Sequence, residues 1–228
     1  MTSQVAPHRG QVKQVLIAPS IIAADFGRIA EEIQAVTAAG ADWIHLDVMD
    51  GHFVPNLTIG PDFIRAVRRA TGVFLDTHLM ISNPLIYLKA YADAGADLLV
   101  VHVETIDNPL AVVRSIHELG VKAGLAINPE TPLVLTPEVF AELDLLLVMS
   151  VHPGFYGQKF ISEVILKVRQ ARRIIDEHGF STLLQIDGGI SPETAPLAVR
   201  AGADVLVAGA AVFKSADYAS AIAALRAC

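Results

Sequence analysis

The sequence predicts an α/β protein of the (β/α)8 barrel type, in which eight parallel strands alternate with eight helices. Short apolar segments of strand length alternate with helical patterns along the chain. The tetrapeptide Ala-Gly-Ala-Asp occurs at 39–42, 94–97 and 201–204, each time between a helical pattern and an apolar run. Gly120 and Gly179 occupy the same place, where a glycine can take the left-handed conformation that ends a helix. These glycines divide the 228 residues into near multiples of a unit of roughly 28 residues, which predicts eight units.

The individual elements follow from the same patterns. Strands are predicted where short runs are almost continuously apolar, as in parallel strands that are covered on both faces. They lie at 15–21, 43–48, 74–79, 98–103, 122–127, 145–150, 182–187 and 204–208. Helices, several of which begin at proline or aspartate, are predicted at 25–38, 61–70, 84–94, 109–119, 137–142, 160–178, 192–201 and 217–226. A doubly wound open sheet is the rival fold, but the turn at 18–26 has neither a dinucleotide-binding nor a P-loop glycine pattern.

No linker rich in Pro, Gly or Ser interrupts the chain, so we expect one domain. Residues 1–13 are predicted to form a polar N-terminal arm, and residues 14–228 a single barrel that carries the catalytic site. With 53% hydrophobic and 18% charged residues, the chain has enough apolar surface to form a packed core.

Charge and cysteine content restrict the setting and the partners. A net charge of −7 argues against a nucleic-acid partner, which would require a basic face, but it leaves a small anionic substrate open. The single cysteine, Cys228, cannot form an internal disulfide, so a reducing, cytoplasmic location is expected. The apolar run 98–103 is only strand-sized, and the sequence predicts neither a signal peptide nor a membrane span.

Polar residues gather at the ends of the predicted strands, where barrels of this type place their active sites. Because side chains alternate along a strand, His45, Asp47 and Met49 should share one face, as should Asp76 and His78. The remaining polar strand ends are Ser20, Asp50, His102, Glu104, Asn128, Ser150, His152, Gln185 and Asp187. No lysine lies where Schiff-base chemistry would need it, since Lys122 begins its strand at the opposite end of the barrel.

Four of these residues, His45, Asp47, His78 and Asp187, form a candidate metal site. A lone histidine is more often a hydrogen-bonded core residue, so the prediction depends on the whole set. Two imidazoles and two carboxylates suit one divalent transition metal ion, such as Zn, Fe(II), Mn or Co, better than Ca or Mg. At the level of spacing alone, a metal site and separate structural roles for these residues remain equal alternatives.

Three glycine-containing segments could contact an anionic ligand. Gly188-Gly189 follows the seventh strand and Gly209-Ala210 follows the eighth, and the loops at these two places commonly bind phosphate in barrels. Tight turns that require glycine explain these two segments equally well. The loop 153–160 after the sixth strand is long enough to fold over a ligand, or it is simply a long connection.

With these motifs the chain resembles the ribulose-phosphate 3-epimerase family over nearly the whole predicted domain. The resemblance runs through APSII at 18–22, HLDVMDGHFVPNLTIGP at 45–61, HLM at 78–80, HVE at 102–104, MSVHPGFYGQKF at 149–160 and DGGI at 187–190. It implies a TIM barrel of the ribulose-phosphate-binding type and an isomerase of carbohydrate metabolism. The expected reaction interconverts D-ribulose 5-phosphate and D-xylulose 5-phosphate in the pentose-phosphate pathway. The resemblance also suggests a homo-oligomer, either a dimer or a hexamer.

The resemblance further implies a role for individual residues. His45, Asp47, His78 and Asp187 would bind the metal, and Asp47 and Asp187 would also be the catalytic acid and base. Met49, Met80 and Met149 would form an apolar cap over the intermediate, although any one of them alone is better explained as core filler. The expected substrate-binding residues are Ser20, His78, Gly154, Phe155, Tyr156, Gly157, Gly188, Gly189, Gly209 and Ala210.

The chain departs from the family pattern beside the chemistry. His152 and Tyr156 replace the usual Asn and Gly, Ala210 replaces a common Ser, and Thr77 replaces a common Val. An epimerase acting on a ketohexose 6-phosphate, such as allulose 6-phosphate, is the alternative function, but the Gly-Gly-Ile after Asp187 favours the pentose substrate. The decarboxylase and aldolase branch generally has a lysine in the segment Asp47-Val48-Met49-Asp50, where this chain has none. A non-catalytic sugar-binding barrel would not explain the four retained ligands.

Overall fold

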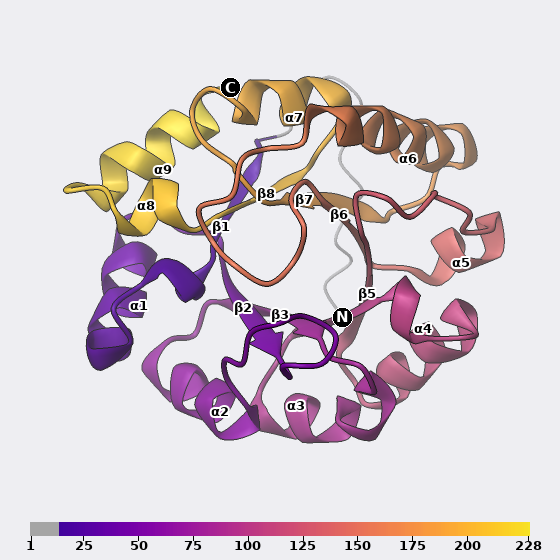
Figure 1. Cartoon of the computed structure of the whole chain (residues 1–228), viewed down its shortest axis with the longest axis horizontal. Coiled ribbons are helices and arrows are strands. Elements are labelled where there is room, and N and C mark those ends of the chain that lie inside the picture. Colours follow the sequence, from indigo (N-terminus) through magenta and orange to yellow (C-terminus); the bar gives the residue numbers. More distant parts are fainter. Residues whose placement is uncertain (1–13) are drawn as a thin grey trace, which may run out of the picture.

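Eight parallel strands form the central ring of the computed structural model, which describes residues 14–228 (Figure 1). The strands are β1 (Leu16–Pro19), β2 (Trp43–Met49), β3 (Phe74–Met80), β4 (Leu98–His102), β5 (Lys122–Ile127), β6 (Leu145–Met149), β7 (Leu183–Asp187) and β8 (Val205–Ala208). The helices outside this ring are α1 (Ile29–Ala38), α2 (Pro61–Ala70), α3 (Leu88–Ala94), α4 (Pro109–Glu118), α5 (Pro137–Glu142), α6 (Ile165–His178), α7 (Ala195–Ala201), α8 (Ala210–Phe213) and α9 (Tyr218–Arg226). The predicted arm at 1–13 lies outside the described residues.

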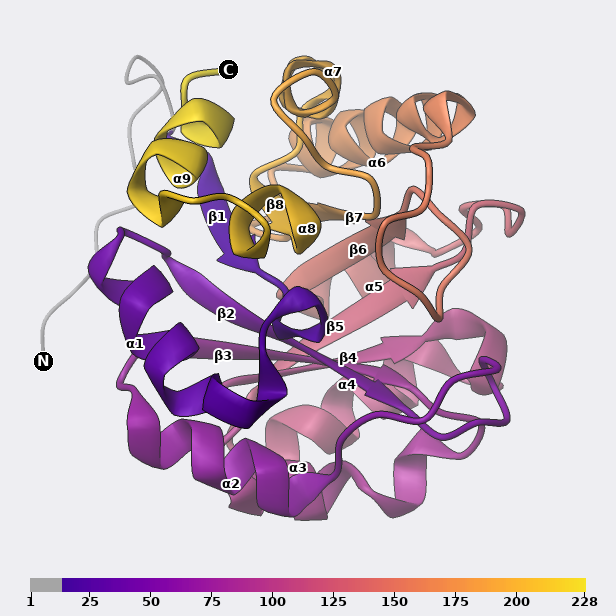
Figure 2. The same ribbon diagram turned by 60° about the vertical axis from the view of Figure 1, so that its left-hand side comes forward.

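The strands follow one another around the ring in chain order, and β8 pairs with β1 (Figure 2). Between β1 and β2 the described residues make a shorter contact, which consists of a parallel bridge from Ser20 to His45 and a 3.0 Å hydrogen bond from the Asp42 amide to the Ile17 carbonyl. The (β/α)8 barrel predicted from the repeated strand and helix pattern is therefore confirmed. No helix among residues 14–228 is long and apolar enough to cross a membrane.

Several helices begin later than predicted, because their first residues form tighter turns. The predicted helix 84–94 starts as a 3-10 turn at Pro84–Ile86 before α3, and the helix predicted from residue 160 begins only at Ile165. Residues 162–164 form a 3-10 turn that leads out of the long loop after β6. Local sequence patterns place a helix well but locate its first turn poorly.

The Ala-Gly-Ala-Asp repeats hold the amino-terminal ends of the strands together. In each repeat the Asp carboxylate accepts a hydrogen bond from a backbone amide of the preceding strand. The pairs are Asp42 with Ile17 at 2.8 Å, Asp97 with Leu75 at 2.7 Å and Asp204 with Leu184 at 2.9 Å. Asp144, which precedes β6, binds the Ala123 amide in the same way at 2.9 Å. The same hydrogen bond, from a backbone amide of one strand to an aspartate before the next, thus recurs before β2, β4, β6 and β8.

Each of these aspartates also pairs with a cation, and in two of the Ala-Gly-Ala-Asp repeats the glycine makes room for an arginine. Arg68 contacts Asp97 at 2.8 Å, and Arg172 contacts Asp204 at 3.2 Å. Gly202 has φ +107°, and a Cβ there would collide with the Arg172 side chain. Glycine therefore satisfies two demands at this position, a left-handed backbone and the close approach of the arginine.

The interior of the barrel changes from apolar to polar along the strand direction. Trp43 and Phe74 stack near the amino-terminal ends of β2 and β3, with ring centroids 4.6 Å apart. Two residues further along the same faces lie His45 and Asp76, followed by Asp47 and His78. The polar side chains thus occupy the middle and the carboxyl-terminal half of β2 and β3.

Candidate active site

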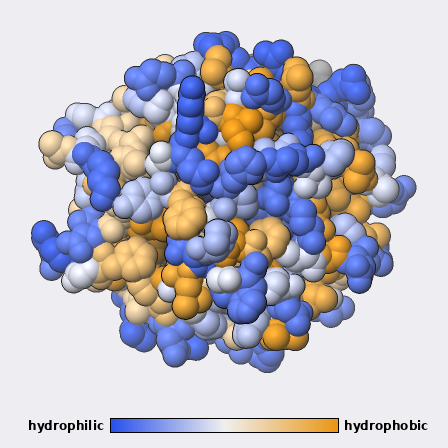
Figure 3. All heavy atoms as spheres, viewed as in Figure 1, coloured by the Kyte–Doolittle hydropathy of each residue, from blue (hydrophilic) through white to orange (hydrophobic). Residues whose placement is uncertain are grey.

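A cavity of about 290 Å³ lies at the carboxyl-terminal ends of the strands. The loop 153–160 passes over this end of the barrel (Figure 1), and hydrophilic and hydrophobic side chains are interspersed over the same face (Figure 3). The walls of the cavity include nearly all the predicted substrate-contacting residues, namely Ser20, Gly154, Phe155, Tyr156, Gly157, Gly188, Gly189, Gly209 and Ala210. The predicted bases Asp47 and Asp187 also line it, whereas His45 and His78 lie buried beneath the cavity wall.

The register of β2 and β3 brings the predicted metal ligands together. His45 lies opposite Asp76, and Asp47 lies opposite His78 in the parallel ladder. With Asp187 from β7, one ligand atom from each of His45, Asp47, His78 and Asp187 lies within 4.8 Å of every other. The strand-end prediction therefore selects four residues that do meet in space and could hold a metal ion.

Asp47 is the most connected residue of this cluster. Its Oδ1 lies 3.2 Å from His45 Nε2 and 3.3 Å from His78 Nδ1, while Ser20 Oγ donates a hydrogen bond to Oδ2. Burial would raise the pKa of Asp47, but the neighbouring His45 outweighs burial and holds that pKa well below its usual range. Asp47 is therefore an ionised carboxylate at neutral pH.

His45 presents one free nitrogen to the cluster. Its Nδ1 hydrogen-bonds Asp76 Oδ2 at 2.7 Å, and Gln185 Nε2 donates to the same oxygen at 2.7 Å. The buried Nε2 has no hydrogen-bond partner and lies 3.8 Å from Asp187 Oδ2. Burial would lower the pKa of His45, but Asp76 and Asp47 outweigh it and raise that pKa well above 6.5. A nitrogen that is surrounded by carboxylates and lacks a partner suits a cation, so these residues fit a metal ion.

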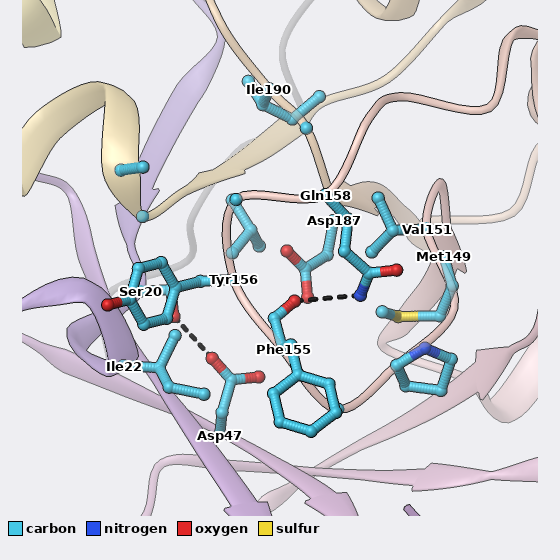
Figure 4. Close-up of a pocket in the computed structure, with 18 of the residues that line it drawn as sticks. Ser20, Ile22, Asp47, Met149, Val151, Phe155, Tyr156, Gln158, Asp187 and Ile190 are labelled. Carbon is cyan, nitrogen blue, oxygen red and sulfur yellow. Dashed lines mark hydrogen bonds between the residues drawn. The ribbon is translucent and has the colours of Figure 1, made fainter.

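Asp187 differs from Asp47 in its electrostatics. Burial and the nearby charge of Asp47 raise the pKa of Asp187 to about 7. The two carboxylates approach the cavity from opposite sides, Asp47 from β2 and Asp187 from β7 (Figure 4). Two carboxyl groups with separated pKa values that face one space are suited to the roles of acid and base.

The sequence does not reveal how the other polar strand ends are used. Asp76 and Gln185 prove to orient His45, as described above. His102 and Glu104 form a hydrogen-bonded chain to His78, with His78 Nε2 2.8 Å from His102 Nε2 and His102 Nδ1 3.0 Å from Glu104 Oε2. The shared spacing of two residues marks Gln185 with Asp187, and His102 with Glu104, but spacing along one strand cannot identify a partner on another.

A few polar contacts hold the loop after β6 in place over the cavity. Asn56 Nδ2 donates to the Gly154 carbonyl at 2.7 Å, which ties this loop to the one after β2. Gln158 Nε2 donates to the Phe155 carbonyl at 2.9 Å, as Figure 4 shows. Lys214 Nζ lies 5.8 Å from the centroid of the Tyr156 ring, so the residue that follows α8 contacts the loop as well. This loop is therefore placed to close over a ligand.

Met49, Met80 and Met149 are buried and line the cavity wall. Their position agrees with the predicted apolar cap, while their role stays a prediction.

The turn after β7 needs glycine for its backbone conformation, because Gly188 and Gly189 have φ +118° and +63°. Among the described residues, the cavity lining contains neither lysine nor arginine, so an anionic group there would meet mainly backbone amides.

Comparison with known proteins agrees with this geometry. Residues 16–213 match the model of the ribulose-phosphate 3 epimerase family. A ribulose-phosphate 3-epimerase of Bacillus subtilis (strain 168) is 50% identical over 213 residues, which cover 93% of this chain and 98% of that protein. One of Mycobacterium tuberculosis (strain ATCC 25618 / H37Rv) is 51% identical over 211 residues, which cover 92% of this chain and 91% of that protein.

Solved structures with low sequence identity share the fold. A 3-hexulose-6-phosphate synthase superposes with a TM-score of 0.64 at 22% identity and covers 94% of this chain and 98% of its own. An orotidine 5'-phosphate decarboxylase from Pyrococcus horikoshii OT3 superposes with a TM-score of 0.63 at 18% identity, and the match covers 92% of this chain and 97% of that one. These two likenesses concern the barrel alone. The family match and the relatives at about half identity go further, and this chain belongs to the ribulose-phosphate 3 epimerase family.

Proposed function

We propose that this enzyme interconverts D-ribulose 5-phosphate and D-xylulose 5-phosphate by inverting C3. The observation that carries the proposal is the pair Asp47 and Asp187, which face one cavity from opposite sides with separated pKa values. The names of relatives at about 50% identity support the same reaction, and they do not favour the ketohexose alternative. Inversion next to a ketone needs a base on one face of the carbon and an acid on the other.

The proton transfers are assigned to these two carboxylates. In one direction a carboxylate takes the C3 proton, the C–H electron pair enters the planar enediolate, and the other carboxylic acid delivers its proton to the opposite face. The roles reverse for the other epimer. Ser20 holds Asp47 in place through its hydroxyl, and Met49, Met80 and Met149 would exclude water from the intermediate.

The ligands for a divalent metal ion would be His45 Nε2, His78 Nδ1 and the carboxylates of Asp47 and Asp187. These atoms fit such an ion because His45 Nε2 is buried without a partner and carboxylates lie around it. Zn, Fe(II), Mn or Co suits this donor set. When bound, the ion would supply Lewis-acid stabilisation of the charge that develops on removal of the C3 proton.

The substrate would extend from the carboxylates towards α8 and the loop 153–160. The backbone amides around Gly188, Gly189, Gly209 and Ala210 would bind the phosphate, and Gly154, Phe155, Tyr156 and Gly157 would cover the sugar. His78 is buried and does not line the cavity, so its contact with the sugar stays a prediction from the family resemblance. A homo-oligomer, either a dimer or a hexamer, and a cytoplasmic location remain predictions from the family resemblance and the cysteine content.

The proposed substrate is tested by comparing kcat/KM for D-ribulose 5-phosphate and D-allulose 6-phosphate under identical metal loading. We expect the pentose phosphate to be preferred about 10-fold or more, because a pocket fitted to one sugar length discriminates against an added carbon by this order. A higher kcat/KM for the hexose phosphate would reverse the substrate assignment while retaining the two-carboxylate chemistry.

A further inference from the structure

A series of hydrogen bonds leads from the proposed metal site to Glu104, in the turn that follows β4. His78 Nε2 lies 2.8 Å from His102 Nε2, and His102 Nδ1 lies 3.0 Å from Glu104 Oε2. Both imidazoles are fully buried, and the second Glu104 oxygen accepts a hydrogen bond from the Asn128 amide at 2.8 Å. With the contact between His78 Nδ1 and Asp47 Oδ1 at 3.3 Å, the series joins two carboxylates through two imidazoles.

The two imidazoles carry fewer N–H protons than the three contacts of this hydrogen-bonded series would need. Two neutral imidazoles bring two N–H groups, whereas the three contacts would each need one, since a carboxylate only accepts. Glu104 accepts the Nδ1 proton of His102, so His102 Nε2 is bare and accepts from His78 Nε2. His78 Nδ1 then carries no proton, which agrees with its contact to Asp47 being the longest of the three.

We propose that Glu104 and His102 are positioning residues that fix the tautomer of His78, so that the lone pair of Nδ1 points into the metal site. The inference rests on the proposed metal function and adds two residues to it. Asp76 orients His45 in a corresponding way, because its carboxylate accepts the His45 Nδ1 proton and directs Nε2 towards the metal site. Each histidine is thus held by a carboxylate that is not itself a ligand, and the other ring nitrogen faces the same space.

Glu104→Gln tests this inference by replacing one carboxylate oxygen with an amide nitrogen. The backbone amide of Asn128 needs an acceptor, so the carbonyl oxygen of the new side chain should face it and the NH₂ group should face His102. The NH₂ group donates, which forces the His102 proton onto Nε2 and the His78 proton onto Nδ1. The substitution therefore reverses the donor and acceptor roles in every hydrogen bond from residue 104 to His78, while the volume of the side chain at 104 is kept.

The matched control is Glu130→Gln. Glu130 Oε1 also lies 3.0 Å from a histidine Nδ1, that of His152, but both side chains are about two-thirds exposed and neither touches the cluster. We expect Glu104→Gln to weaken Zn²⁺ binding about 10- to 100-fold in chelator competition, and Glu130→Gln to leave it unchanged. Long-range ¹H–¹⁵N NMR of the metal-free proteins at mildly alkaline pH reports the tautomers directly.

Wild-type protein is expected to show His102 protonated at Nδ1 and His78 protonated at Nε2, with both assignments exchanged in Glu104→Gln. His78 protonated at Nδ1 in the wild type would overturn the inference even if the variant failed to fold. Equal Zn²⁺ affinity and unchanged tautomers in Glu104→Gln would also overturn it, leaving the metal site intact. Failure of the wild-type protein to bind Zn²⁺ at all would instead remove the proposed metal function.

Discussion

Asp187→Asn is expected to lower kcat for epimerisation by about 10²- to 10⁴-fold, the usual contribution of one acid or base group. The substitution keeps the shape of the side chain, but the amide can neither take the C3 proton nor deliver one. Asp187 approaches the cavity from β7, opposite Asp47, so no other carboxylate that lines the cavity among residues 14–228 can replace it (Figure 4). Steady-state kinetics with each epimer, together with a thermal unfolding curve, would measure the effect.

Exchange of the C3 hydrogen with solvent deuterium tests the role of Asp187 more specifically than turnover does. Because Asp187 is also a proposed metal ligand, this experiment is done at saturating Zn²⁺. Asp47 can then still remove and return a proton on one face, so in D2O one epimer should exchange its C3 hydrogen without inversion. Asp62→Asn on α2 is the control, because its carboxylate is fully exposed and its replacement should leave turnover unchanged. Turnover of Asp187→Asn at the wild-type rate would refute the two-carboxylate assignment.

Asp47→Asn is expected to reduce turnover at least as much as Asp187→Asn and to weaken Zn²⁺ binding as well. Asp47 contacts His45, His78 and Ser20 through its two oxygens, so the loss of its charge affects several partners at once. Its pKa lies far below neutrality, and the wild-type group is therefore charged under assay conditions. Kinetics at saturating Zn²⁺ and chelator competition would separate the two effects.

The exchange pattern of Asp47→Asn should mirror that of Asp187→Asn. At saturating Zn²⁺, the remaining Asp187 faces the other side of C3, so exchange without inversion should be confined to the opposite epimer. Exchange of the same epimer in both variants would contradict the assignment of the two carboxylates to opposite faces, even if both variants were slow.

The proximity of the candidate metal ligands on β2 and β3 could be predicted from the sequence, because it depends on side-chain alternation and on parallel strand pairing. Alternation along β2 and β3 puts His45 with Asp47 and Asp76 with His78, and the parallel register then aligns the two pairs. The hydrogen-bond partners depend on details that spacing does not contain. Gln185 reaches Asp76 across the barrel interior over 109 positions of sequence, and no local pattern predicts that contact.

The fold shows the same limit. The glycine in each Ala-Gly-Ala-Asp repeat predicts where a helix ends, and the left-handed backbone of Gly95 and Gly202 confirms it. The following aspartate carries no local signal of its role, because its cation comes from elsewhere in the chain. Asp42, for example, pairs with Arg226 of the last helix. The length of the loop 153–160 predicts that it could fold over a ligand, but no local pattern predicts the hydrogen bond from Asn56 to the Gly154 carbonyl.

Metal-assisted inversion at C3 by the buried His and Asp cluster can be tested in a single experiment. The most direct measurement incubates the protein with D-ribulose 5-phosphate in D2O, as isolated, after chelation, and after addition of Zn, Fe(II), Mn or Co, and follows C3 by NMR. We expect D-xylulose 5-phosphate with deuterium at C3, with formation lost on chelation and restored by at least one of these metals. Undiminished inversion in the fully chelated protein, or no exchange at C3 with any metal, would contradict it.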